Sequence, residues 1–308
     1  MLQGIKKIWP PFFLLASLIF IGRYFYNQAD RLDAILHLAP VFLAIAAMLQ
    51  LIYWFMSVRC WQRIVILSAH KTISFMQGFK HLALLTLGKY FPGKIWGMVA
   101  RSSLMKQQGI ALHQSAHATF YEQSLLLHAS GLVSAFLLHA INPSRYTFSL
   151  CILAAASVIL IVPLQRMVFG LLVRLAKKSW RQELQETTPF AFRPMIGLLA
   201  GYSIVWLVIG LMFSCIYFAL FPAAPTLLMI MRLVLANTIG ITLGFFAVFS
   251  PGGLGVREAI TTGLLASQLS LEDALVLSLV FRLWIVISEM LNGIVLLVPH
   301  KAGTGGAA

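Results

Sequence analysis

The chain has 308 residues, of which 60% are hydrophobic and only 10% are charged. A soluble domain of this size carries about 25% charged residues, so most of this surface must face lipid, and an ordinary soluble enzyme is excluded. The 23 Lys and Arg residues outnumber the 9 Asp and Glu residues and give a net charge of +14, but they lie mainly between hydrophobic segments. The positive-inside rule and anionic lipid headgroups account for this pattern, so we expect no nucleic acid partner.

Hydrophobic segments long enough to cross a bilayer recur along the chain. A spanning helix needs about 20 mostly apolar residues. Five segments meet this requirement, and residues 146–164 are marginally long enough. We therefore predict an all-α polytopic membrane protein with about six full spans, at residues 8–25, 38–58, 120–140, 146–164, 195–221 and 274–298.

Two further hydrophobic regions, residues 75–100 and 226–268, are each interrupted near the middle by a Pro-Gly pair. The pairs are Pro92-Gly93 and Pro251-Gly252. Proline removes a backbone donor and glycine weakens a helix, so each pair ends one helix and begins another. We predict two re-entrant helical hairpins, which enter and leave the membrane on the same side. The alternative is that each region forms one kinked span.

The two interruptions lie roughly half the chain length apart, which indicates an internal repeat. The shift that superposes them also lays residues 38–58 onto 197–217 and residues 120–140 onto the last predicted span. Two units of span, hairpin and span that begin on opposite membrane sides form an inverted repeat, an arrangement typical of transporters. We predict one integral membrane domain, divided into a first span (1–37), repeat 1 (38–140), a connecting span with a basic cytoplasmic loop (141–194), repeat 2 (195–298) and a tail (299–308).

Positive charge is distributed unevenly across the predicted membrane. With both broken regions re-entrant, residues 1–7, 59–80, 166–194 and 299–308 share one side and hold most of the Lys and Arg residues. The loops on the other side hold only Arg23, Arg31 and Arg145. The positive-inside rule therefore places the N-terminus in the cytoplasm.

Basic and glycine residues cluster around both interruptions. The candidates for substrate binding are Lys89, Lys94 and Arg101 at the first, and Ser250, Gly252, Gly253, Gly255, Arg257 and Glu258 at the second. A glycine-rich turn that leads into a helix leaves backbone N–H groups unpaired at a positive helix end, which suits a phosphate or carboxylate. We predict a positively lined site for an anionic headgroup. The alternative is that the glycines only permit tight turns while the bases extend to the interface.

The last predicted span also contains two charged residues, Arg282 and Glu289. A charge that faces lipid near the bilayer centre costs about 2.5 to 3.5 kcal/mol, so both must face the protein interior and we add them to the site. They lie about 10 Å apart along the helix axis, so Arg257, Glu258 or a substrate phosphate would have to join them. A purely structural ion-pair network is the alternative. Glu122 lies near a predicted span end, where we expect it to extend to the interface.

No catalytic arrangement is readable in the sequence. His113 and His117 lie one helical turn apart but lack a third metal ligand. The predicted cytoplasmic loops are too short to fold as a catalytic domain. We therefore expect no enzyme activity, no cofactor and no metal.

Residues 87–101 and 250–259 together resemble the flippase-like transmembrane region of lysylphosphatidylglycerol synthases. The resemblance covers roughly the second span to the last, and it implies a lipid-handling protein of the bacterial cytoplasmic (inner) membrane. The residues that match the family motifs are Lys89, Pro92, Gly93 and Arg101, then Pro251, Gly252, Gly253, Gly255, Arg257 and Glu258. The sequence ends at Ala308 without the soluble aminoacyl-transferase domain of the full-length relatives, so we expect no synthase activity.

These observations lead to one main hypothesis, a flippase or lipid transporter. An anionic phospholipid or polyprenyl-linked glycolipid headgroup would enter a midplane cavity between the hairpins, and rocking of the repeats would expose it to either leaflet. Lys94, Arg101, Arg257 and Arg282 would hold its phosphate. The alternative is the membrane subunit of an aminoacyl or glycosyl transferase whose catalytic partner, an enzyme of a cell-envelope pathway, is separate. A third hypothesis is an ion-coupled transporter of small solutes.

Overall fold

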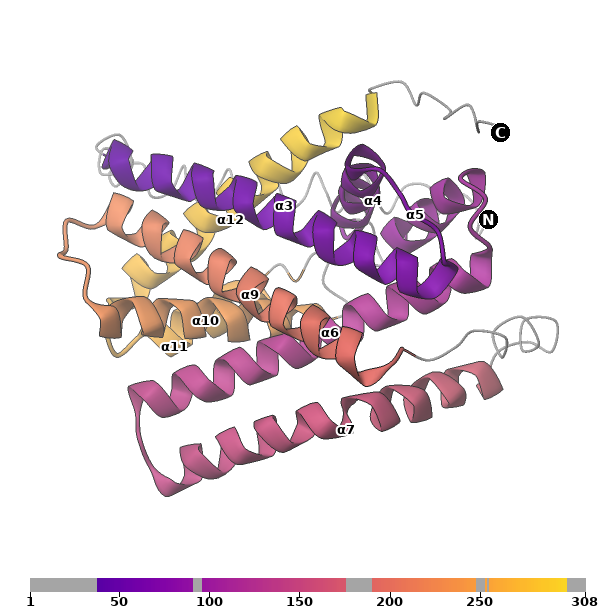
Figure 1. Cartoon of the computed structure of the whole chain (residues 1–308). Helices are drawn as coiled ribbons and strands as arrows, with labels where there is room; N and C mark the ends of the chain where they lie inside the picture. Colours follow the sequence, from indigo (N-terminus) through magenta and orange to yellow (C-terminus); the bar gives the residue numbers. More distant parts are fainter. Residues whose placement is uncertain (1–37, 91–95, 176–189, 248–252, 254, 298–308) are drawn as a thin grey trace, which may run out of the picture.

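The structure is a computed structural model that describes residues 38–90, 96–175, 190–247, 253 and 255–297. These residues form nine α-helices and no strands, as predicted (Figure 1). The helices are α3 (Pro40–Ala69), α4 (Phe75–Gly88), α5 (Trp96–Gln107), α6 (Leu112–Ile141), α7 (Arg145–Leu175), α9 (Phe192–Leu220), α10 (Leu227–Phe246), α11 (Val256–Leu265) and α12 (Leu271–Ile294), with a 3-10 turn at Val295–Leu297.

Six of these helices are long and apolar enough to cross a membrane, namely α3, α6, α7, α9, α10 and α12. Five of them confirm predicted spans. The sixth, α10, lies in the second broken region and has 20 residues, a length of about 30 Å. The predicted first span at residues 8–25 lies outside the described residues.

The bundle is organised around α9. Within its most apolar stretch 72% of the residues are buried, against 17% in α7, which packs at the edge of the bundle against α6 (Figure 1). One core cluster surrounds Trp61, Tyr121 and Tyr202, where α3, α6 and α9 meet. A second surrounds Phe213 and Phe281, where α9 meets α12. The exposed surface of α7 is rich in Leu, Ile and Phe, as expected for a helix that faces lipid.

The order of a long helix, two shorter ones and a long one occurs twice. It runs from α3 to α6 and again from α9 to α12, and the shift that superposes the two Pro-Gly pairs also lays α5 on α11 and α6 on α12. The Ala39 N–H donates to the Ala219 carbonyl at 3.1 Å, so the start of α3 lies beside the end of α9. These two helices are therefore antiparallel, and the pairs α4–α5 and α10–α11 leave them at opposite ends of the bundle (Figure 1).

The α4–α5 pair begins and ends at the same end of the bundle. Lys71, just before α4, donates from Nζ to the Gly109 carbonyl, just after α5, at 2.6 Å. The two helices cross at glycines, since a Cβ added to Gly88 would lie 2.1 Å from the Gly97 Cα. With 14 and 12 residues, the helices are about 21 Å and 18 Å long, too short to span alone. This geometry favours a hairpin over a kinked span for the first broken region.

Glycines also join α10 and α11. A Cβ added to Gly240 would lie 2.1 Å from Thr261 Oγ1, and one added to Gly244 would lie 3.1 Å from the Arg257 Cβ. Contact positions move backward on α10 as they move forward on α11, so the helices are antiparallel. Small residues one turn apart permit this close approach, which is the main source of helix association in lipid.

Candidate functional site

Glu289 of α12 connects the last helix to the end of α4. It forms an ion pair with the Lys89 ammonium, and its other oxygen accepts a hydrogen bond from the Tyr90 hydroxyl at 2.6 Å. A glycine one turn further on α12 makes room for α4, because a Cβ at Gly293 would lie 2.9 Å from Leu87 Cδ1. Two predicted site residues from distant parts of the chain are thus in contact.

The first turn of α11 brings a second group of charges to α12. Glu258 caps this helix, with Oε2 accepting from the Gly255 N–H at 2.7 Å, and its Oε1 lies 3.9 Å from Arg282 Nη1. Arg257 donates from Nη2 to Asn237 Oδ1 on α10 at 3.2 Å. The guanidinium of Arg282 lies 5.8 Å from the centre of the Tyr90 ring, which joins the two groups.

We refer to these residues as the charged cluster: Lys89, Tyr90, Asn237, Arg257, Glu258, Arg282 and Glu289. Its two arginines and two glutamates are all at most 7% exposed. Three basic groups face two carboxylates, which leaves one unit of positive charge in excess. The sequence of the two Pro-Gly interruptions, residues 91–95 and 248–254, contains no Asp or Glu. Buried charge is strongly unfavourable without a counter-ion, so an anion would stabilise this cluster.

Uncharged polar groups that the sequence did not single out lie within one turn of the cluster. The Thr261 hydroxyl on α11 and the side-chain amide of Asn292 on α12 are buried without a hydrogen-bond partner among the described residues. Asn237 keeps its amide nitrogen unpaired in the same way. Buried polar groups are usually paired, so these donors are available to a ligand. Their only sequence signal is a polar residue inside an apolar helix.

The predicted glycines have conformational roles. Gly253 and Gly255 have φ angles of 74° and 81°, which side chains with a Cβ rarely adopt. A Cβ at Gly253 would also lie 2.9 Å from the Gly244 carbonyl oxygen. The tight-turn interpretation therefore applies to these two. Three predicted site residues, Lys94, Ser250 and Gly252, lie outside the described residues.

Arg101 does not join the charged cluster. It is 1% exposed, forms an ion pair with Glu122 at 2.7 Å, donates to Thr119 Oγ1 at 2.9 Å and lies over the Trp61 ring at 3.8 Å. The prediction that Glu122 extends to the interface is wrong, because this residue is buried. The helix begins at Leu112 instead of at residue 120, so Glu122 lies almost three turns inside it.

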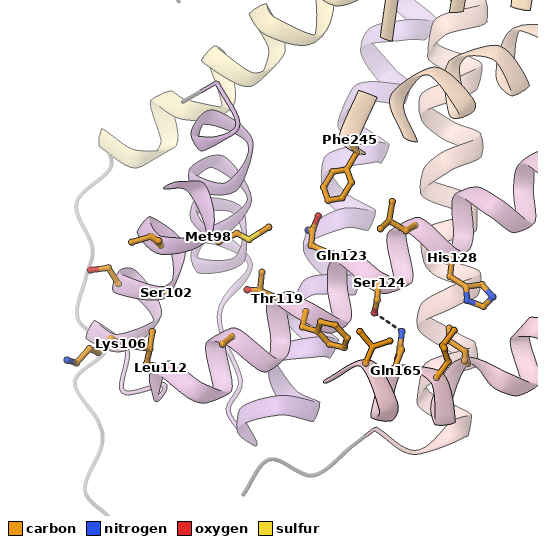
Figure 2. A pocket seen from close by; sticks show the side chains of 18 residues that line it. Met98, Ser102, Lys106, Leu112, Thr119, Gln123, Ser124, His128, Gln165 and Phe245 are labelled. Atoms are coloured by element: carbon orange, nitrogen blue, oxygen red, sulfur yellow. Dashed lines mark hydrogen bonds between the residues drawn. The ribbon is translucent and has the colours of Figure 1, made fainter. Parts of the chain in front are cut away.

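A groove of about 960 Å³ lies between α5, α6 and α7, with Phe245 of α10 at one end (Figure 2). We call it the α5–α6–α7 groove. None of the predicted site residues that the structure describes lines it. Thr119 does line it and also accepts the hydrogen bond from Arg101. At the groove end, Phe245 follows Gly244, which packs on Arg257 of the charged cluster.

A smaller cavity of about 430 Å³ lies between α6, α10 and α11 at the other end of α6. Arg232, Asn142 and Gln268 are among its lining residues. The groove thus lies along the first half of α6, and the smaller cavity lies at the end of this helix.

Long apolar helices, two antiparallel pairs of shorter helices and buried charges define this chain as a polytopic helical membrane protein. Residues 10–293 match the family described as the lysylphosphatidylglycerol synthase TM region, and the chain belongs to this family. A comparison with curated proteins finds no match. Membership confirms the resemblance seen in the sequence and supports a lipid-related role in the membrane.

Proposed function

We propose that this protein moves a lipid with an anionic headgroup from one membrane leaflet to the other. One observation carries the proposal: the charged cluster, where α10, α11, α12 and the end of α4 meet, has one excess positive charge, and its arginines and glutamates are buried. A phosphate bound there would supply the missing negative charge and would pair with donors such as Arg257 and Arg282. The family to which the chain belongs supports a lipid as the carrier of that phosphate.

The two antiparallel pairs would act as hairpins that enter from opposite sides, α4–α5 as a re-entrant hairpin and α10–α11 as a hairpin whose first helix, α10, is long enough to cross the membrane. This placement is supported by the shared end of α4 and α5 and by the antiparallel course of α3 and α9. The site between two such hairpins is accessible from either side when the repeats rock against each other. The α5–α6–α7 groove and the smaller cavity at the other end of α6 would then be the two approaches.

The charged cluster contains one weak contact at which a phosphate could act. Glu258 and Arg282 are 3.9 Å apart, longer than the usual charge-assisted hydrogen bond of about 2.7 to 2.9 Å. A phosphate that pairs with Arg282 would compete with this contact and leave Glu258 as the cap of α11. Lipid binding would thereby change how α11 is held against α12. We also propose an inner-membrane location with a cytoplasmic N-terminus, supported by the bias of basic residues toward one side.

The test is a scrambling assay in reconstituted vesicles. Fluorescent phosphatidylglycerol is incorporated, and its accessibility to dithionite, which bleaches only the outer leaflet, is measured over time. We expect the purified chain to accelerate the exchange. Arg257→Gln should lower the rate by roughly ten- to a hundredfold, since a hydrogen bond to a charged group is worth about 1.5 to 3 kcal/mol. Arg145→Gln, which removes an exposed arginine at the start of α7, is the matched control and should leave the rate unchanged.

Equal rates for wild type and Arg257→Gln would remove the charged cluster from the mechanism. A different result would favour the alternative of a transferase subunit: neither phosphatidylglycerol nor a polyprenyl-phosphate sugar is exchanged, and a soluble protein stays bound to the chain through purification. The described residues contain no group of three His, Cys, Asp or Glu that could hold a metal ion, and we propose no catalytic role for this chain itself.

A further inference from the structure

The α5–α6–α7 groove is built from one face of each of its three helices. The lining residues of α6 recur every three or four positions from Leu112 to His128, which places them on a single helical face about 24 Å long. Exposed apolar side chains form the rim, among them Val99 on α5 and Leu164 and Val168 on α7. The groove is therefore open sideways, toward the position of lipid acyl chains.

Uncharged hydrogen-bonding groups lie within this apolar groove. Gln123, Ser124 and His128 project from α6, and Gln165 of α7 lies opposite Ser124 (Figure 2). Gln165 donates from Nε2 to Ser124 Oγ at 2.6 Å. Its other amide atom, Oε1, is buried and has no hydrogen-bond partner among the described residues. Gln165 as a whole is only 5% exposed. A buried amide oxygen of this kind is an acceptor for a ligand O–H group.

The groove has no negative charge of its own. Its lining includes no Asp or Glu. The carboxylate of Glu122 lies directly behind it, since Oε2 accepts from the lining residue Gln123 at 3.4 Å, but the charge of Glu122 is balanced by Arg101 at 2.7 Å. The one charged lining residue is Lys106, which stands exposed at the rim (Figure 2). An ammonium that entered this groove would lose water and meet no carboxylate in the lining, because the nearby charge of Glu122 is balanced by Arg101, and this is strongly unfavourable. A phosphate near Lys106 would be attracted.

We propose that the α5–α6–α7 groove binds one membrane lipid whose headgroup links a single phosphodiester to an uncharged, hydroxyl-bearing group, and that it rejects headgroups carrying an ammonium. The hydroxyl-bearing group lies along Gln123, Ser124 and Gln165, the phosphate lies toward Lys106, and the acyl chains leave across the apolar rim. The proposal rests on the proposed function in one respect only, that the bound lipid is the one transported.

Two lipids that differ only in an aminoacyl group on the glycerol provide the test. Phosphatidylglycerol and its lysyl ester share acyl chains, phosphate and glycerol, but the ester adds two ammonium groups. The full purified chain is mixed with both at equal concentration, and native mass spectrometry measures the ratio of bound species. We expect phosphatidylglycerol to be favoured by roughly tenfold or more. Separate mixtures with phosphatidylinositol and with a polyprenyl-phosphate sugar identify which hydroxyl-bearing headgroup binds best.

A variant that adds a negative charge to the groove tests whether the selectivity arises there. Gln165→Glu changes shape very little but places a carboxylate among the groove residues, so the preference for phosphatidylglycerol should fall by roughly tenfold or reverse. Gln107→Glu makes the same chemical change at an exposed position of α5 that does not line the groove, and it should keep the wild-type ratio. If Gln165→Glu unfolds, Gln123→Glu tests the same point from the half-buried face of α6.

Equal binding of the two lipids by wild type would overturn the proposal. So would an unchanged ratio in a folded Gln165→Glu or Gln123→Glu protein. Binding does not depend on transport, so the two proposals fail separately: selective binding without exchange between leaflets contradicts the transport function alone, and exchange of both lipids at equal rates and affinities contradicts only the selectivity of the groove.

Discussion

Replacing Glu289 with glutamine should change stability and anion binding in opposite directions. Glu289 is almost fully buried, and it holds the Lys89 ammonium and the Tyr90 hydroxyl. Breaking a fully buried ion pair costs about 3 to 5 kcal/mol, whereas an exposed pair contributes at most about 1 kcal/mol. The Lys89 side chain is 33% exposed, so water screens part of the loss. We expect Glu289→Gln to lower the free energy of unfolding by about 1 to 3 kcal/mol, while the glutamine still accepts from Tyr90.

The same substitution raises the excess charge of the cluster from one unit to two. At an effective dielectric constant of about 20, one more unit of charge about 8 to 10 Å from a bound anion is worth about 2 kcal/mol. Affinity for an anionic headgroup should therefore rise roughly ten- to thirtyfold. Thermal unfolding in detergent, with and without added phosphatidylglycerol, measures both effects, because a ligand that binds the folded state raises its stability by an amount that grows with the logarithm of its affinity.

The matched control is Glu272→Gln, which changes the net charge of the protein equally at an exposed position at the start of the same helix. This variant should lower the free energy of unfolding by no more than about 1 kcal/mol, through the lost interaction with the helix end. It should leave the stabilisation of the protein by lipid unchanged. A Glu289→Gln protein that binds phosphatidylglycerol more weakly than wild type would refute the reasoning, since Glu289 would then contact a positive part of the ligand.

Two further predictions concern the helix pairs. Gly240→Ala places a methyl group 2.1 Å from a side-chain oxygen of α11 and should destabilise the protein by about 1 to 3 kcal/mol, whereas Gly263→Ala in α11 meets no atom within 4 Å and should stabilise it by up to about 1 kcal/mol, both measured by thermal unfolding. For topology, single cysteines are introduced at exposed Thr72, Gln107 and Ser267 after removal of the native ones. We expect a membrane-impermeant maleimide to label the first two from one side and the third from the other, whereas kinked spans would place the first two on opposite sides.

Most of the fold could be predicted because hydropathy is read along the chain without knowledge of neighbours. The long apolar helices α3, α7, α9 and α12 follow directly from their composition. The start of α6 could not be placed in this way. Its first turns carry His113, Gln114 and His117, which read as a boundary, yet His117 is buried against Ser68 and three aromatic rings. Tertiary packing therefore extends α6 toward its N-terminus, beyond the segment that hydropathy identifies, and buries Glu122.

The charged cluster could be predicted in part and the groove could not. Arg282 and Glu289 are predictable because a charge inside an apolar segment must face protein, whatever its partner. Lys89, Arg257 and Glu258 are predictable because they flank the two Pro-Gly interruptions. The lining of the groove has no such signal. Serine and glutamine are tolerated on many helix faces, and these residues acquire meaning only when α5, α6 and α7 turn the same faces toward one another.

The position of α12 explains how the charged cluster connects the two helix pairs, α4–α5 and α10–α11. Arg282 and Glu289 lie two turns apart on one face, about 10 Å along the axis, and each contacts a different helix pair: Arg282 meets Glu258 of α11, and Glu289 meets Lys89 beside α4. A continuous helix transmits a displacement along its axis with little loss. Movement of one pair against α12 therefore shifts the charges that face the other pair. An anion bound between Arg257, Arg282 and Lys89 would contact both pairs at once, and its gain in binding energy would depend on their relative position. Such differential binding is what a ligand needs in order to shift a conformational equilibrium.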